Sequence, residues 1–272
     1  MIRKILHSTH ALIGFCMILS VCTIALSAPV LAPHDPNAVH LSGKFLPPTA
    51  GYPLGTDHLG RCVLSRLLYG ARYSMGIAIP VLLLLAGIST VLGTLGAWFG
   101  GVFDAILLML CDIMMAFPPI VLLLAFLGSF SQSAGTVILS IVFSMWVWFV
   151  KVIRSAVLIE KKKGYITAAK IAGDTSFGII VHHLFPNIVP VIIVYFSTGL
   201  AAIILMISAY SFLGLGLGSD TPEWGAMLAY SKQYLYSHPM LIVYPGLCIL
   251  FAAAGCNIFG EAVRDALSPQ EA

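Results

Sequence analysis

Long apolar runs alternate with short polar segments along the whole chain. Six runs are long enough to cross the roughly 30 Å hydrocarbon core of a bilayer as helices of about 20 residues. They occupy residues 11–31, 75–98, 105–127, 136–159, 188–210 and 241–259. The pattern predicts an all-α membrane protein with six transmembrane helices, and an even number of crossings places both termini on one side.

The composition agrees with this pattern and excludes a soluble globular domain. Of the 272 residues, 59% are hydrophobic and only 9% are charged, and the mean hydropathy is +0.99. An ordinary soluble domain carries roughly 25% charged residues, and a compact fold of this length buries too little surface to hide so many apolar side chains. The net charge of +3 is small and scattered, which argues against a nucleic-acid partner.

The first apolar run admits a second interpretation as a cleaved signal peptide. It follows Arg3 and Lys4 and contains Ala25-Leu26-Ser27, which resembles a signal-peptidase site. An uncleaved first helix is favoured, because the run is longer than the apolar region of about 7–15 residues in a signal peptide. Pro29 also follows the site almost at once.

Basic residues set the expected orientation. With both termini inside, nine of the 14 Lys and Arg residues fall in cytoplasmic segments. The cluster at 161–163 lies directly at the end of the fourth span, where this bias acts most strongly. We therefore expect a multi-pass protein of the cell inner (plasma) membrane with both termini in the cytoplasm.

The spans divide the chain into four parts. Residues 1–31 hold the N-terminal tail and the first transmembrane helix, and residues 32–74 form a Pro-rich periplasmic segment ending in a helical stretch. Residues 75–262 form a core with five transmembrane helices and an inner loop at 160–186. Residues 263–272 form a C-terminal cytoplasmic tail.

The inner loop 160–186 carries the most informative pattern. It is too polar and too interrupted to span the membrane, and it predicts two short helices separated by Gly173. A glycine supplies the left-handed backbone position that commonly ends a helix. Ala168 and Ala169 lie on the first helix and add no bulk to its surface, which allows close approach by another protein.

The second helix of this loop is predicted to start at a side-chain cap and to be amphipathic. Asp174 or Thr175 supplies the cap. A spacing of i, i+3, i+4 and i+7 predicts one apolar stripe, formed by Phe177, Ile180, Val181 and Leu184. Pro186 is expected to close this helix and to begin the next span.

Taken alone, the pattern fits an amphipathic hairpin lying on lipid as well as it fits a docking loop. The order of Ala168, Ala169, Gly173, His183 and Pro186, however, resembles the EAA loop of ABC importer permeases. In that family the loop is the cytoplasmic segment that docks into a cleft on the ATPase subunit. The resemblance is specific, because five positions match over nineteen residues.

Other stretches resemble one branch of that superfamily, the short inner-membrane permease subunit of dipeptide, oligopeptide and nickel importers. They lie at 54–61, 65–74, 211–216, 223–225, 245–247 and 264–267. The resemblance covers about 33–269, nearly the whole chain. Trp146 and Trp148, together with the short chain, lean toward the nickel-type subunits.

The resemblance implies a type I ABC importer permease fold and a role in ATP-driven import of nickel, a metal chelate or small peptides. The chain would form half of the translocation pathway, with a second homologous permease, two ATP-binding subunits and an extracytoplasmic substrate-binding protein as partners. ATP hydrolysis would occur in a separate subunit, so this chain would have no catalytic residue, metal site or cofactor. The expected ATPase-coupling residues are Thr167, Ala168, Ala169, Gly173, His183 and Pro186.

Four positions depart from the family pattern. Thr167 stands where the EAA loop usually has Glu, and Cys62 stands where the outer signature usually has Asp. Met109 replaces a frequent Arg of the third span, and Glu261 replaces an Asp. The change at Thr167 removes the carboxylate from one expected ATPase contact.

Two acids and a row of small residues in the spans need an explanation. Asp104 and Asp112 lie roughly on one helical face, and an intramembrane acid is costly enough to suggest function by default. A structural role is favoured, with Asp104 at the inner interface and Asp112 bonded to a neighbouring helix.

A row of small residues along the second span predicts close helix packing, within the chain or against a second permease. It consists of Ser89, Gly93, Gly96, Ala97 and Gly100.

Residues that would support other chemistry form no motif. The six cysteines include no CxxC pair, and most lie in apolar runs, so they are expected to be buried hydrophobes. Outer histidines such as His58 are expected to be solvated side chains.

A secondary transporter stays open as an alternative function, although paired broken helices in repeated halves are not evident. An intramembrane hydrolase would need a motif such as HExxH or GxSxG, and both are absent.

Overall fold

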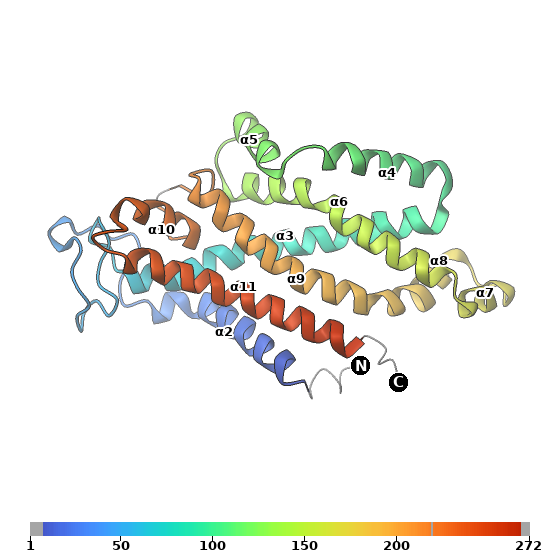
Figure 1. Cartoon of the computed structure of the whole chain (residues 1–272), viewed down its shortest axis with the longest axis horizontal. Helices are drawn as coiled ribbons and strands as arrows, with labels where there is room; N and C mark the ends of the chain where they lie inside the picture. The colour runs from blue at the N-terminus through green and yellow to red at the C-terminus, as the bar shows by residue number, and fades with distance from the viewer. Residues whose placement is uncertain (1–7, 219, 268–272) are drawn as a thin grey trace.

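The computed structural model describes residues 8–218 and 220–267, and within these ranges the chain is built from helices joined by loops. Five helices lie side by side along the length of the molecule (Figure 1). They are α2 (Thr9–Leu31), α3 (Val63–Phe99), α6 (Ala134–Lys161), α9 (Phe185–Phe212) and α11 (Met240–Leu267). All five are long and apolar enough to cross a membrane, which matches five of the six predicted crossings.

The remaining crossing is broken. A single helix is predicted at 105–127, whereas the structure has α4 (Gly101–Met115) and α5 (Pro119–Ser129) at an angle of 87°. The break coincides with Pro118 and Pro119. Each proline lacks an N–H donor and pushes the preceding residue out of the helical region. The pair counts as a sixth crossing only as a broken span.

Helix α3 is longer than the apolar run within it. It has 37 residues, about 55 Å at 1.5 Å per residue, against a hydrocarbon core of roughly 30 Å. The helical stretch predicted for the end of the periplasmic segment and the second span form this one helix, which runs unbroken through Ser74. Its N-terminal part therefore extends beyond the apolar layer.

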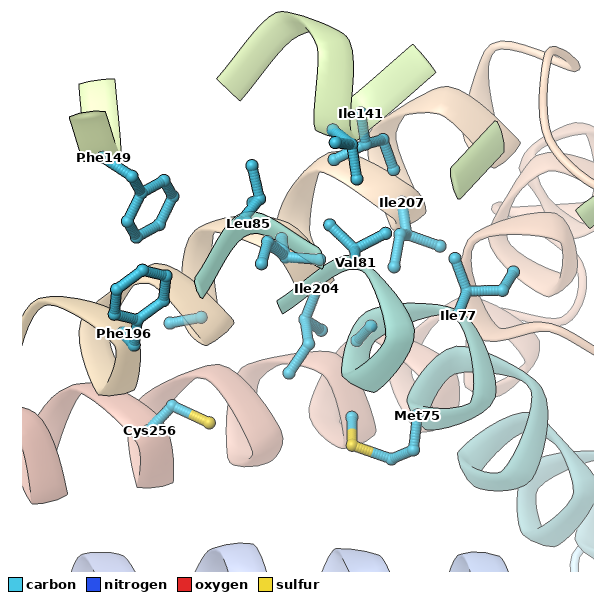
Figure 2. Packing of buried hydrophobic residues seen from close by; sticks show 14 of the residues in the cluster. Met75, Ile77, Val81, Leu85, Ile141, Phe149, Phe196, Ile204, Ile207 and Cys256 are labelled. Atoms are coloured by element: carbon cyan, nitrogen blue, oxygen red, sulfur yellow. The ribbon is translucent and has the colours of Figure 1, made fainter. Parts of the chain in front are cut away.

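The core lies between α3, α6, α9 and α11. Val81 and Leu85 of α3, Ile141 of α6 and Ile204 of α9 are fully buried there and point toward one another (Figure 2). The rings of Phe149 and Phe196 stack with their centroids 4.5 Å apart. Moving such side chains out of lipid brings no gain comparable to moving them out of water, so tight packing is the main attraction between these helices.

Small residues bring the backbones together, as the spacing on α3 predicts. A Cβ on Gly93 would lie 2.9 Å from the carbonyl oxygen of Val150 on α6, and one on Gly96 would lie 2.8 Å from Leu107 on α4. Ser89 is fully buried. The row therefore packs within the chain up to Ala97, whereas Gly100 ends α3 with φ of +68° and has free space around it. Helices α2 and α11 approach in the same way, because a Cβ on Gly14 would lie 2.5 Å from the amide nitrogen of Phe259.

The end of the molecule opposite α7, predicted to be the outer end, is formed by the segment between α2 and α3 and by the connection between α9 and α11. The first contains the 3-10 turn η1 (Leu41–Gly43), and the second contains α10 (Trp224–Ser231) and the 3-10 turn η3 (Lys232–Tyr234). Asp57 holds the first segment together. Its Oδ1 accepts hydrogen bonds from the Leu59 and Arg61 amides, and its Oδ2 lies 2.7 Å from Arg61 Nε.

Candidate coupling site

The inner loop forms a short helix, α7 (Gly164–Ile171), that is closed at Gly173. Gly173 has φ of +87°, and its N–H donates to the Lys170 carbonyl at 3.1 Å. The next amide, of Asp174, donates to the Ala169 carbonyl at 3.1 Å. This pair of bonds is the Schellman arrangement, in which a left-handed residue satisfies the last carbonyls of a helix. The predicted role of Gly173 as a helix terminator is confirmed.

The second helix of the loop begins where predicted but does not end there. Thr175 caps it, with its Oγ1 accepting a hydrogen bond from the Gly178 amide at 3.1 Å. The chain then runs through α8 (Ser176–Gly178) and the π-helical turn η2 (Ile179–Leu184) directly into α9. The prediction that Pro186 closes a separate helix is wrong, since helix continues from Ser176 to Phe212.

The π-helical turn explains why Pro186 does not interrupt this helix. Within η2 the Phe185 amide donates to the Ile180 carbonyl, five residues back. The wider turn shifts the hydrogen-bond register just before Pro186, whose nitrogen carries no hydrogen. A proline at the first position after such a shift costs the helix little.

The same turn divides the predicted apolar stripe. Leu184 is buried and Ile180 is partly buried against the core, whereas Phe177 is 75% exposed and Val181 is 40% exposed. A π-helical turn holds more residues than an α-helical turn, so positions spaced for a period of 3.6 no longer share one face. The prediction of one continuous stripe is wrong, and Phe177 instead extends from the surface.

His183 and Asp174 connect the two halves of the loop. His183 Nε2 lies 3.2 Å from Asp174 Oδ2, and both side chains are partly exposed. The contact joins the turn after α7 to η2. The sequence pattern did not indicate this pair, because its two members are nine residues apart and belong to different elements.

The expected coupling residues all belong to this one segment, at the end of the molecule opposite α10 (Figure 1). Thr167, Ala168, Gly173 and Pro186 are exposed, His183 is partly exposed and Ala169 is buried. Ala169 thus packs inward, and Ala168 alone provides the small outward surface. Beside it, Ile171 is 82% exposed, and with Phe177 it gives the segment an apolar tip.

Contacts with α3 and α6 anchor α7 on the protein. Lys170 Nζ lies 5.2 Å from the centre of the Trp98 ring at the end of α3. Trp98 is itself held by α6, because Lys161 Nζ donates to the Trp98 carbonyl at 2.6 Å. Tyr165 donates from its hydroxyl to Glu160 Oε2 at 2.7 Å. Burial and this hydrogen bond raise the pKa of Tyr165 to about 12.

The two intramembrane acids form ion pairs with α6. Asp104 accepts two hydrogen bonds from the Arg154 guanidinium, at 2.6 and 2.5 Å. Asp112 Oδ1 lies 2.8 Å from Lys151 Nζ. The expectation that Asp112 bonds to a neighbouring helix is confirmed, and Asp104 pairs with the same helix. Met109 on α4 replaces the Arg that is frequent in the family, and Lys151 on α6 is the basic partner of Asp112 instead.

The outer histidines contact aromatic residues. His58 stacks on Tyr234 and His238 stacks on Phe45, with centroids 5.5 and 4.1 Å apart. Burial lowers the pKa of His58. In the part of the chain that the structure describes, no group of three His, Cys, Asp or Glu residues is arranged to hold a metal ion.

The signature at 223–225 forms a clamp at the outer end. Glu223 is fully buried and caps α10 by accepting hydrogen bonds from the Gly225 and Ala226 amides. Its Oε1 also accepts a hydrogen bond from Ser74 on α3, at 3.1 Å. Trp224 donates from Nε1 to the Leu67 carbonyl at 3.0 Å. The connection after α9 is thereby fixed to the outer part of α3.

Comparison with known proteins gives a consistent result over the whole chain. Residues 73–271 match the family described as binding-protein-dependent transport system inner membrane component. Residues 1–48 match the N-terminal transmembrane domain of oligopeptide transport permease C.

Individual relatives cover nearly the full length. The chain is 32% identical to the nickel transport system permease protein NikC of Escherichia coli K12, over 90% of this chain and 89% of the relative. It is 34% identical to the dipeptide transport system permease protein DppC of Haemophilus influenzae, over 96% and 90%. It is 33% identical to the metal-staphylopine import system permease protein CntC of Staphylococcus aureus, over 99% and 93%.

The family is one of multi-pass inner-membrane subunits, which agrees with the apolar helices and favours an importer over a secondary transporter. Its members are permeases rather than enzymes. The chain belongs to the family of inner-membrane components of binding-protein-dependent transport systems and is a permease subunit of an ATP-driven importer.

Proposed function

We propose that this permease forms half of a translocation pathway and is driven through the segment 160–186. Its partners would be a second homologous permease, two ATP-binding subunits and an extracytoplasmic substrate-binding protein. The similarity to permeases of nickel, dipeptide and metal-staphylopine systems supports nickel, a metal chelate or a small peptide as substrate. The four-part division at residues 31, 74 and 262 belongs to this proposal.

The observation that carries the proposal is the exposed surface of the segment 160–186, called the coupling segment below. Hydrogen bonds within the segment hold this surface, called its tip, in place. The tip presents Thr167 and Ala168 beside the Gly173 turn. Because helix continues from Ser176 to Phe212, a displacement of the tip by an ATPase subunit is passed directly into α9. A rigid element of this kind suits a two-state switch between inward and outward openings.

The proposed orientation places this tip in the cytoplasm. Helix α2 begins and α11 ends on the side of the molecule that carries α7 (Figure 1). The lysines at 161–163 lie at the same end, and basic residues favour the cytoplasmic side. Both termini are then cytoplasmic, and α10 and the segment 32–62 face outward.

A charge placed in the Gly173 turn tests the coupling role. A Cβ at Gly173 meets no atom within 4 Å, and Asp tolerates a left-handed backbone better than most residues. Gly173→Asp is therefore expected to leave the protein in the membrane and to abolish ATP-dependent uptake. The measurement is uptake by the assembled importer in proteoliposomes, together with the amount of permease in the membrane.

Gly164→Asp provides a matched control, because Gly164 is also exposed, opens α7 and has free space around its Cβ. An acid at a helix N-terminus is tolerated. Normal uptake by Gly173→Asp would refute the coupling role. Equal loss in both variants would show that any charge on this surface blocks docking, and the special role of the Gly173 turn would then be rejected.

A further inference from the structure

A cavity of about 640 Å³ with both polar and apolar walls lies at the outer end of α3. This site is called the outer cavity below, and it is lined by Tyr69, Arg72, Tyr73, Gly76 and Ile77 of α3 and by Ala134, Leu217 and Thr221 of the facing elements. Its volume is in the range of sites that hold small molecules, roughly 300–1,000 Å³. Neither the coupling segment nor the clamp at Glu223 uses these side chains.

Arg72 is the charged group among the described residues that line this cavity. Its side chain is exposed, and in the described ranges its guanidinium has no hydrogen bond or ion pair. The other two arginines at this end differ, because Arg61 pairs with Asp57 and Arg66 donates to the Pro36 carbonyl at 2.9 Å. Arg72 is thus left available for a ligand.

Arg72 lies where its guanidinium can stay in water. It lies nine residues after the start of α3, about 14 Å along the helix axis, at the outer boundary of the apolar run. A long basic side chain near the end of a span keeps its charged head hydrated, so Arg72 needs no internal partner. Beyond the exposed Gly76, the same face of α3 becomes apolar with Ile79 and Leu83.

The walls of the cavity are fixed by other contacts. A Cβ on Gly70 would lie 2.4 Å from the Trp224 ring, which holds the connection after α9 close to α3. Gln132 Nε2 donates to the Gly216 carbonyl, which holds the start of α6 against the same connection. Pro80 has no N–H, so the Gly76 carbonyl lacks its usual helical donor. The cavity is therefore preformed, and Arg72, Tyr69 and Tyr73 supply polar groups among mainly apolar walls.

We propose that the outer cavity contacts the transported solute and that Arg72 binds a carboxylate of that solute. A guanidinium binds a carboxylate through two parallel hydrogen bonds, and the Tyr69 and Tyr73 hydroxyls add neutral donors. The inference rests on the proposed function and narrows its substrate class. A bare divalent cation is repelled by Arg72, whereas a peptide or a metal chelate with a free carboxylate is attracted.

Charge-selective labelling tests the cavity without transport. Gly76→Cys places a thiol in the outer cavity, where a Cβ meets nothing within 4 Å. The importer is treated with an anionic sulfonatoethyl and a cationic trimethylammonioethyl methanethiosulfonate, with and without ATP and vanadate. Gly51→Cys in the segment 32–62 is the matched control, because Gly51 is exposed and equally unobstructed. The unsubstituted chain gives the background from the native cysteines.

The ratio of anionic to cationic labelling rates should be roughly three- to tenfold higher at Gly76→Cys than at Gly51→Cys, as expected for one nearby unit charge. Adding Arg72→Gln should remove this excess, and adding Arg72→Lys should keep it. An unchanged ratio in the Arg72→Gln background would overturn the proposal. So would the absence of labelling at Gly76→Cys in both nucleotide states while Gly51→Cys reacts.

Competition identifies the carboxylate. Glycylglycine should slow anionic labelling of Gly76→Cys at least twofold, whereas glycylglycinamide and nickel chloride at equal ionic strength should not. Equal protection by the dipeptide and its amide would reject the carboxylate contact. Failure of the proposed coupling would appear separately, as normal uptake by Gly173→Asp, and would leave these labelling rates unchanged.

Discussion

Gly93 and Gly173 are glycines for different physical reasons. Gly93 lies in the middle of α3, where a Cβ would lie 2.9 Å from the Val150 carbonyl oxygen and 3.0 Å from Ile153 Cβ. Gly173 has open space around it but a φ of +87°, which a residue with a Cβ adopts only at a cost of about 1–2 kcal/mol. Gly93 therefore allows α3 and α6 to pack closely, and Gly173 allows the chain to turn at the end of α7.

Replacement of Gly93 by Ala should destabilise the protein. The helix gains about 1 kcal/mol of propensity, but overpacking against α6 costs about 1–3 kcal/mol, so the net effect is a loss of about 1 kcal/mol. Thermal unfolding of the purified protein in detergent measures it. Gly87→Ala on the same helix has free space at its Cβ and should be neutral or stabilising; equal midpoints for both variants would contradict the packing role of Gly93.

At the scale of the element, α7 depends on its contacts. Eight residues are too few to hold a helix in water, so burial of Ile166 and Ala169 and the polar anchors on α3 and α6 determine its order. The sequence pattern indicated the helix, its end at Gly173 and a following cap at Asp174 or Thr175, since these features depend on neighbouring residues. It did not indicate the π-helical turn, which depends on how α9 packs.

Lys170→Gln should loosen α7. Its ammonium group lies over the Trp98 ring, and such a contact contributes about 0.5–1 kcal/mol at an exposed site. Limited proteolysis of the segment 160–186 should proceed about two- to fivefold faster in this variant. Lys162→Gln is the control, because the described residues offer its side chain no partner. Unaltered cleavage in Lys170→Gln would show that the anchor is unimportant.

Tyr165 should make the stability of this region sensitive to alkaline pH. Its pKa is raised from 10.0 to about 12, so the folded state binds the phenolic proton more tightly than the unfolded state. The resulting stabilisation is complete below pH 10 and is lost as the pH rises toward about 12. The unfolding midpoint should fall more steeply over that window in the native chain than in Tyr165→Phe; parallel slopes would contradict this linkage.

At the scale of the whole molecule, two long helices extend beyond the apolar layer at opposite ends. Helix α3 extends outward and carries the outer cavity, whereas the helix from Ser176 to Phe212 extends past the layer at the coupling end. The two helices pack directly against each other, with Val81 and Leu85 of α3 beside Ile204 of α9 (Figure 2). In the proposed mechanism, this packing would pass a movement of the segment 160–186 to the outer cavity.

An isolated copy of this chain should not be the functional unit. Expressed with its candidate partners, the full chain should co-purify with a second permease and two ATP-binding subunits, as native mass spectrometry would measure. Gly173→Asp should reduce recovery of the ATP-binding subunits, and Gly164→Asp should not. Recovery of a transport-active chain without any ATP-binding subunit would contradict the importer arrangement.

The sequence by itself determined the all-helical membrane fold, five of the crossings, the Gly173 turn and the resemblance to importer permeases. These features follow from the local hydrophobic pattern and from residues with restricted backbone conformations. The tertiary structure alone decided that α4 and α5 are bent apart, that helix runs through Pro186 and that Asp112 pairs with Lys151. It also showed that Arg72 has no partner in the described ranges. Each depends on which surfaces meet in space, and a one-dimensional pattern does not contain that information.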